Sequence, residues 1–296
     1  MLTFYAAVQY AFLAGVPDSV SHFGFLTITN ITGFVIALFF FFGELFRLDK
    51  RQVLQSIVLS AELVVVNGCM LAGAKGISTT VSACILSAYF IFVPVLGLLV
   101  FHEKPDVKSF PGIAVALIGL FFLMNMDVGG MMNKNVMLLI ITDIAFALYI
   151  LTLSRVSSNS NPSIIAMGQM FFSALFSFII WIGEVLFFGG TFELPSSPLF
   201  WGGVLYISFF IRGLYGIVQL YAQRYISALN TALIFSTEIV MTMLVSPLLT
   251  IVFGTPPEEI NGMKIAGACI MLVGIMLADD SVREAVKGRL KHEKKG

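Results

Sequence analysis

The sequence predicts an all-α membrane protein with about ten transmembrane helices in an inverted 5+5 repeat. Three observations support this fold class. Charged residues make up only 11% of the 296 residues and hydrophobic residues 58%, whereas soluble domains carry about 25% charged residues. Apolar runs of about 20 residues, the length that crosses a bilayer, recur along the chain. Segments of the two halves also resemble each other.

The apolar runs between polar or helix-breaking residues predict the individual helices. A segment inside a bilayer must satisfy its own backbone hydrogen bonds, and long runs of Leu, Ile, Val and Phe favour helices over barrel strands. The first helix could be short or kinked, because Pro17 removes a backbone hydrogen bond near its end. The predicted ranges are 3–21, 25–46, 53–74, 77–101, 110–126, 136–154, 164–188, 200–222, 227–253 and 262–278.

The basic residues predict the orientation of these helices. Loops on the cytoplasmic side of membrane proteins are enriched in Lys and Arg. With a cytoplasmic start, thirteen of the seventeen Lys and Arg residues fall inside, three fall outside, and Arg212 lies within a span. We therefore expect both termini in the cytoplasm and the protein in the plasma (inner) membrane. The thirteen are Arg47, Lys50, Arg51, Lys104, Lys108, Arg155, Arg224, Arg283, Lys287, Arg289, Lys291, Lys294 and Lys295.

An internal repeat is visible at an offset of about 150 residues. The segment Lys75–Ser87 aligns without gaps with Arg224–Ser236, sharing a basic residue, Ile-Ser and a closing Ser. Glycines spaced seven apart follow in both copies, at positions 112 and 119 and at 267 and 274. Leu- and Ile-rich helices can align by chance, but the shared order of features favours a duplication.

The repeat predicts how the chain is divided. We expect a first five-helix repeat over 1–130, a second over 131–278 and a basic cytoplasmic tail over 279–296. Because five is an odd number, the second copy enters the membrane in the opposite orientation. Inverted repeats are typical of secondary transporters, whose two bundles move about a site near the middle of the bilayer.

Four ionisable residues lie within the predicted spans. Glu62, Arg212 and Glu238 are near mid-depth, and Asp143 is somewhat off-centre. Each charge at the bilayer centre costs about 2.5–3.5 kcal/mol on insertion scales. Such groups must pair with one another, take up protons or line a water-filled space.

The spacing of these groups predicts a central cavity. Glu62 and Arg212 are 150 residues apart, close to the repeat offset, and so occupy nearly equivalent positions on repeat-related helices. We expect them either to hold opposite ends of a zwitterionic solute in a central cavity or to form a structural salt bridge. Arg212, Tyr215 and Gln219 follow one stripe of a helix, and Tyr89 aligns with Glu238 at an offset of 149. We expect Glu62, Arg212, Tyr215, Gln219 and Tyr89 to bind substrate.

The remaining polar groups of the spans are open to two interpretations. Glu238 and Asp143 are candidates for proton coupling, because a desolvated carboxyl group binds a proton more readily than one in water. They could also be hydrogen-bonded packing residues. Gln169, Asn67 and Asn230 are expected to be interhelical hydrogen-bond partners.

Several functional classes are excluded by composition and motifs. The net charge is zero, so no basic surface indicates nucleic acid, and three widely separated histidines indicate no metal site. Gly-x-Ser-x-Gly and nucleotide-binding glycine loops are absent. We therefore expect neither an enzyme nor a cofactor, and any uphill transport would use a proton or solute gradient.

One further stretch carries a resemblance to a known family. Pro94–Glu103 followed by Gly112, together with the two repeated segments, resembles the drug/metabolite transporter superfamily, specifically its EamA-like ten-helix permeases. The resemblance implies a central cavity lined by helices 1, 3, 4, 6, 8 and 9, and alternating-access transport of a small metabolite, often export of an amino acid. Two alternatives are a non-transporting sensor or assembly protein and a membrane enzyme acting on lipid.

Overall fold

The computed structural model describes residues 21–74, 79–104, 107–123, 134–190, 198–238, 240–241, 243–244 and 261–279. Within these ranges the secondary structure is entirely helical. The first predicted helix, apart from Ser21, and the basic tail, apart from Asp279, lie outside the described residues.

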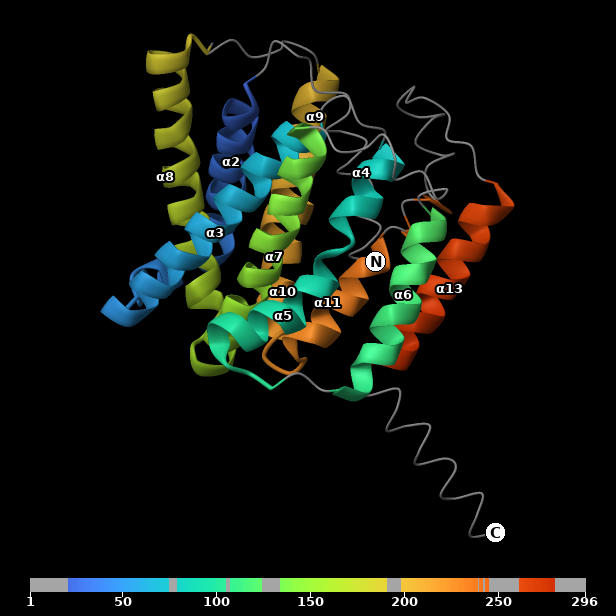
Figure 1. The fold of residues 1–296 in the computed structure, drawn as a ribbon. Helices are drawn as coiled ribbons and strands as arrows, with labels where there is room; N and C mark the ends of the chain where they lie inside the picture. The colour runs from blue at the N-terminus through green and yellow to red at the C-terminus, as the bar shows by residue number, and fades with distance from the viewer. Residues whose placement is uncertain are drawn as a thin grey trace.

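The helices follow the predicted apolar runs closely (Figure 1). Short polar signals define several ends. Ser21 caps the first described helix by accepting a hydrogen bond from the Gly24 amide at 3.1 Å, as expected for an N-cap. The bounds are α2 His22–Leu45, α3 Lys50–Ala74, α4 Thr79–Leu86, α5 Tyr89–Phe101, the 3₁₀-helix η1 Val107–Ser109, α6 Phe110–Leu123, α7 Lys134–Asn159, α8 Pro162–Phe188, α9 Pro198–Tyr206, the π-helix η2 Ile207–Tyr215, α10 Gly216–Ala222, α11 Ala228–Ser236 and α13 Gly262–Ala278.

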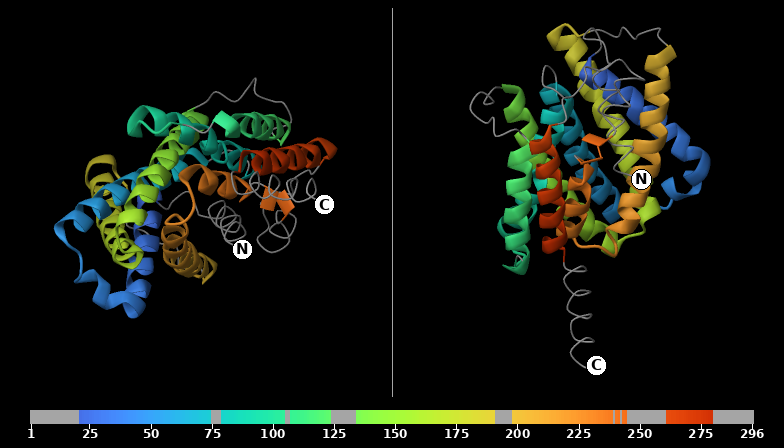
Figure 2. Two further views of the ribbon diagram at one scale, coloured as in Figure 1. Left: turned by 90° about the horizontal axis from the view of Figure 1, so that it is seen from below. Right: turned by 90° about the vertical axis from the view of Figure 1, so that its right-hand side faces the viewer.

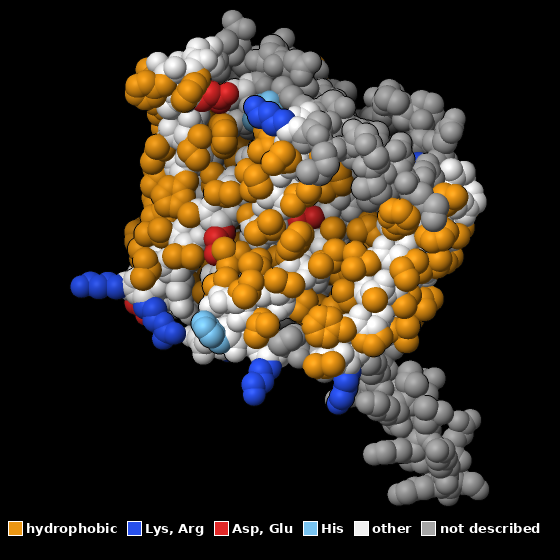
Figure 3. All heavy atoms as spheres, viewed as in Figure 1, with side chains coloured by type: hydrophobic (Ala, Val, Ile, Leu, Met, Phe, Trp, Pro, Cys, Tyr) orange, Lys and Arg blue, Asp and Glu red, His pale blue; other side chains and the backbone are white. Residues whose placement is uncertain are grey.

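Six described helices are long and apolar enough to cross a membrane, and two shorter apolar helices accompany them. Apolar side chains cover most of the face drawn in Figure 3, and most of its visible Lys and Arg side chains lie at the lower edge. The predicted all-helical membrane architecture is therefore confirmed, whereas the count of ten helices stays a prediction. The six spans are His22–Leu45, Lys50–Ala74, Cys84–Phe101, Lys134–Asn159, Pro162–Phe188 and Phe200–Ala222; the shorter helices are Val107–Leu123 and Gly262–Ala278.

Two helices predicted as continuous are interrupted. The range 77–101 contains α4 and α5, separated by a turn at Ser87 and Ala88. In the range 227–253, α11 ends at Ser236 and a turn follows at Thr237. The Ser236 hydroxyl donates a hydrogen bond to the Ser87 carbonyl at 3.1 Å, so the two interruptions lie against each other.

The range 200–222 was predicted as one regular α-helix, and this is wrong for its centre. Residues Ile207–Tyr215 form a π-helix between α9 and α10. The Ser208 hydroxyl donates to the Val204 carbonyl at 2.7 Å and to the Thr29 carbonyl of α2 at 3.0 Å. Serine bonds of this kind compete with the regular backbone pattern, and π-segments are frequent at functional sites.

α6 and α13 form a closely packed pair at one side of the bundle, visible in both views of Figure 2. Gly119 packs on Gly267, and Gly112 packs on Gly274 and Ala278. Positions that rise along one helix therefore fall along the other, so the two helices run antiparallel. The glycines noted in the sequence let the two backbones approach closely, as small residues do in membrane bundles.

Candidate functional site

A cavity of about 150 Å³ lies among α2, α3, α4, α5, α7, α8, η2 and α10. Six of the seven residues predicted for the site line it. The charged and polar lining residues are Asn30, Asn67, Tyr89, Thr142, Asp143, Tyr149, Gln169, Ser173, Arg212, Tyr215, Gln219 and Glu238; the apolar ones include Leu63, Val66, Met70, Leu86, Phe146, Ala166, Met170, Ile211 and Leu220.

Arg212 projects from the π-helix against α2. A Cβ atom on Gly33 would lie 2.9 Å from the Arg212 Cβ, so only glycine leaves room for this approach. The buried Nε of Arg212 has no hydrogen-bond partner, and no ion pair links Arg212 to a carboxylate in the described part of the chain. The guanidinium group is thus available to the cavity.

Tyr149 was not predicted for the site, yet it lines the cavity. Its side chain is 3% exposed, and its hydroxyl accepts a hydrogen bond from the Gln169 Nε2 at 2.9 Å. It is close enough to interact electrostatically with Glu62, Arg212 and Tyr215. The interhelical role predicted for Gln169 therefore has a named partner.

Aromatic rings form one wall beside Tyr149. The Tyr89 and Phe146 rings meet edge to face with centroids 5.0 Å apart, and Phe146 stacks on Tyr149 at 5.9 Å. Tyr215, from the π-helix, contacts the ring of Phe235 at 5.5 Å. These contacts fix the rings, because such pairs favour defined geometries.

Asp143 is 1% exposed, and its Oδ1 atom has no hydrogen-bond partner. Gln219 is 3% exposed, and its Nε2 has none either. A buried polar group without a partner costs about 1–3 kcal/mol. Glu238 lines the same cavity one residue past the turn at Thr237.

Glu62 does not line this cavity. Its Oε1 accepts a hydrogen bond from the Thr152 hydroxyl of α7 at 3.0 Å, and its Oε2 is buried without a partner. No ion pair joins it to Arg212. The substrate-binding role of Glu62 stays a prediction that this geometry does not support.

Two of the predicted interhelical amides behave differently from Gln169. Asn67 donates to the Leu63 carbonyl of its own helix at 2.6 Å, and the Oδ1 of Asn230 is buried without a partner. By contrast, Asn30 joins α2 to α8 by donating to the Ser177 hydroxyl at 3.2 Å. Two lining residues that were not predicted, Phe146 and Tyr149, did have one signal in the sequence. They follow the predicted Asp143 at intervals of three residues and so recur on one helical face.

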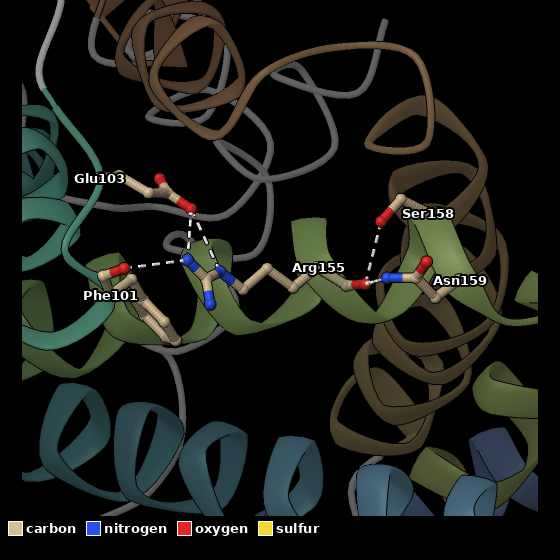
Figure 4. A network of polar contacts seen from close by, with 5 residues as sticks. All are labelled: Phe101, Glu103, Arg155, Ser158 and Asn159. Atoms are coloured by element: carbon tan, nitrogen blue, oxygen red, sulfur yellow. Dashed lines mark hydrogen bonds and ion pairs between the residues drawn. The ribbon is translucent and has the colours of Figure 1, made fainter.

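Beyond the cavity, Arg155 links the ends of α5 and α7 (Figure 4). Its Nη2 donates to Glu103 Oε1 at 2.8 Å and to the Phe101 carbonyl at 3.2 Å, and its guanidinium lies 4.2 Å from the centre of the Phe101 ring. Both charged side chains are about half exposed, at 47% and 49%. Such a pair contributes little stability by itself.

No group of three His, Cys, Asp or Glu residues suited to a metal gathers in the described ranges.

The comparisons with known proteins agree with this architecture. An uncharacterized transporter of Archaeoglobus fulgidus is 25% identical over 257 residues, which cover 86% of this chain and 78% of that protein. A solved crystal structure superposes with a TM-score of 0.68 over 96% of this chain and 97% of its own, at 14% identity, and so shares the fold. The name of the Archaeoglobus relative points to a transporter, whereas the solved structure speaks for the fold alone.

The family itself is shown by a match that covers most of the sequence in two blocks. The model of the EamA-like transporter family matches residues 1–125 and 133–278. Membership implies a small-molecule substrate and a lipid environment, as the sequence resemblance also implied. The chain therefore belongs to the EamA-like transporter family.

Proposed function

We propose that the chain is a secondary active transporter that moves a small metabolite across the membrane by alternating access, with amino acids as the first substrates to test. The observation that carries this proposal is the cavity of about 150 Å³, in which Arg212 and Asp143 have unpartnered polar atoms. Charged groups buried among apolar spans are expensive. A polar solute that passes through the cavity would provide partners for them.

An inverted 5+5 arrangement of ten helices, divided at 1–130 and 131–278, is part of the proposal. It is supported by the two separate blocks of the family match. Contacts between repeat-related positions also support it: Ser236 bonds to Ser87 at the offset of 149, and α6 packs antiparallel on α13 through paired glycines. The two interrupted helices resemble the discontinuous helices that line the sites of many transporters.

The orientation and the location follow from the charge distribution. We propose that the edge where Lys and Arg gather in Figure 3 faces the cytoplasm of a plasma membrane, with both termini on that side. The positive-inside rule supports this orientation. Labelling of single cysteines introduced beside Arg47 and beside Gly189 would test it in intact cells. These positions follow the C-terminal ends of α2 and α8, which run antiparallel, and so lie on opposite sides of the bundle.

Glu238 and Asp143 remain the candidates for proton coupling, because both are carboxyl groups that line the cavity. Glutamine at position 238 keeps the shape of the side chain but cannot release a proton. In Glu238→Gln proteoliposomes, flux that no longer responds to an imposed pH gradient would support this role. Unchanged proton dependence would exclude Glu238 and leave Asp143→Asn as the next variant.

The decisive experiment is reconstitution of the purified chain in liposomes with a panel of radiolabelled metabolites, amino acids first. We expect saturable counterflow for at least one solute, and its loss in an Arg212→Gln variant that still folds. The alternative of a non-transporting sensor or assembly protein predicts no flux for any solute. Arg47→Gln is a suitable control, because Arg47 pairs with Glu44 outside the cavity.

A further inference from the structure

The cavity contains hydrogen-bond donors that lack acceptors, and these point to the chemistry of the solute. This inference deepens the function proposed above and rests on it. Arg212, Tyr149 and Gln219 all line the cavity. Each has a donor group to which no acceptor in the described part of the chain is bonded.

The first donor is the guanidinium of Arg212. This group has five N–H donors and accepts no hydrogen bond. Its buried Nε is unpartnered, and no carboxylate of the described chain forms an ion pair with it. Its Cβ is held against α2 at Gly33, so the position of the side chain is fixed by packing. An isolated cation away from water is strongly unfavourable, and a bound anion would compensate it.

The second and third donors come from neighbouring elements. The Tyr149 oxygen already accepts a hydrogen bond from Gln169 at 2.9 Å, so its own proton remains to be donated. Tyr149 also lies within electrostatic range of Arg212. Gln219, on α10, has an Nε2 without an acceptor and is 3% exposed. None of these three donor groups is bonded to an acceptor among the described residues.

The one unpartnered carboxylate of α7 lies elsewhere in the cavity. Asp143 precedes Tyr149 by six residues, which is about 9 Å along an α-helix. Its Oδ1 atom is an acceptor without a donor. Donors and acceptors are therefore separated along α7, and no carboxylate of the described residues forms an ion pair with Arg212.

We propose that Arg212, Tyr149 and Gln219 form an oxyanion-binding subsite that holds a carboxylate or phosphate group of the transported solute. A guanidinium fork matches both groups in geometry. The Tyr149 hydroxyl adds a further donor beside Arg212, and Gln169 fixes its orientation. Tyr149 is thus a substrate-binding residue that was not predicted from the sequence.

The test is a binding assay on the purified full-length chain in detergent, at constant ionic strength set with sodium chloride. Four probes are compared by their effect on the melting temperature and by calorimetric titration: butyrate, inorganic phosphate, butyramide and butylammonium. We expect butyrate or phosphate to bind and to raise the melting temperature, and their relative affinities identify which oxyanion the subsite prefers. Butyramide has nearly the shape of butyrate without its charge and should not bind.

The variants locate the effect. Arg212→Gln should weaken anion binding by ten-fold or more, and Tyr149→Phe by about ten-fold, the size expected for one hydrogen bond to a charged group. Arg47→Gln, which changes an arginine outside the cavity, should bind as the natural chain does. Equal binding of butyramide or butylammonium, absence of binding by both anions, or full anion affinity in Arg212→Gln would each overturn the proposal. The comparison of anion with amide uses only the natural chain, so it stands even if a variant fails to fold.

The outcome is separable from that of the transport proposal. Flux of solutes without any anion preference would overturn the subsite and leave the transporter function intact. Anion binding lost in Arg212→Gln, together with no flux for any solute in liposomes, would support the subsite and favour a sensor. Both measurements use the same protein preparation.

Discussion

Replacing Gly267 by alanine tests how closely α6 and α13 pack. A Cβ atom at position 267 would lie 2.7 Å from the Leu123 amide nitrogen and 2.8 Å from the Gly119 carbonyl oxygen, and ordinary contact begins at 3.4 Å. Both neighbours are backbone atoms, which cannot rotate away. The two helices must therefore separate locally by about 0.7 Å, the difference between 3.4 and 2.7 Å.

The magnitude follows from this separation. A radial gap of about 0.5–1 Å forfeits a quarter to a half of the dispersion energy of each contact, and overpacking typically costs about 1–3 kcal/mol. Alanine recovers up to about 1 kcal/mol through its higher helix propensity. We therefore expect Gly267→Ala to lower the free energy of unfolding by about 1–2 kcal/mol.

The assay is reversible unfolding by SDS in mixed micelles, followed by circular dichroism. Gly183→Ala is the matched control, because no atom lies within 4 Å of its added Cβ, and it should be neutral or slightly stabilising. Adding Gly119→Ala to Gly267→Ala should cost less than the sum of the single changes, since one separation relieves both contacts. A Gly267→Ala chain as stable as Gly183→Ala would refute the close packing.

Two further predictions concern polar contacts inside the bundle. Ser177→Ala removes the hydroxyl that accepts a hydrogen bond from Asn30 at 3.2 Å, and it should lower the free energy of unfolding by about 0.6–1.7 kcal/mol in the same assay. Ser173→Ala is the control, because the Ser173 hydroxyl has no partner, and it should change the free energy of unfolding little. A larger loss of stability in Ser173→Ala than in Ser177→Ala would contradict the α2–α8 contact. Exchanging Glu62→Arg with Arg212→Glu should not restore transport to a dead single variant, because no ion pair joins these residues. Recovery of flux in the double variant would show that the two charges do pair.

The positions of most helices could be predicted because the membrane imposes one strong requirement. The run 262–278 coincides with α13, and 164–188 differs from α8 by two residues at its start. Polar or helix-breaking residues terminate each run, so hydropathy alone finds the ends. No such signal marks the interruption at Ser87, where the apolar pattern continues and the turn bonds to Ser236 from the other half. Local backbone changes of this kind depend on tertiary partners.

The site residues also divide into those that the sequence could predict and those that it could not. Arg212 and Asp143 were predictable because a charge within an apolar span needs a functional or structural reason. Glu62 satisfied that condition too, and it lies on the same face of α3 as Val66 and Met70, which line the cavity. Its side chain nevertheless accepts a hydrogen bond from Thr152 of α7 and is not among the lining residues. The sequence shows the depth of a charge in the membrane more readily than the direction in which it points.

The cavity and the glycine-paired helices occupy different parts of the bundle. None of the described residues that line the cavity comes from α6 or α13, and these two helices pack on each other more closely than side chains would allow. The interrupted helices, in contrast, present Tyr89 and Glu238 to the cavity directly after their turns. A turn without a regular hydrogen-bond ladder can change its dihedral angles at lower cost than a helix interior. In the proposed transporter, the interrupted helices that line the cavity would therefore move at lower cost than the closely packed α6–α13 pair.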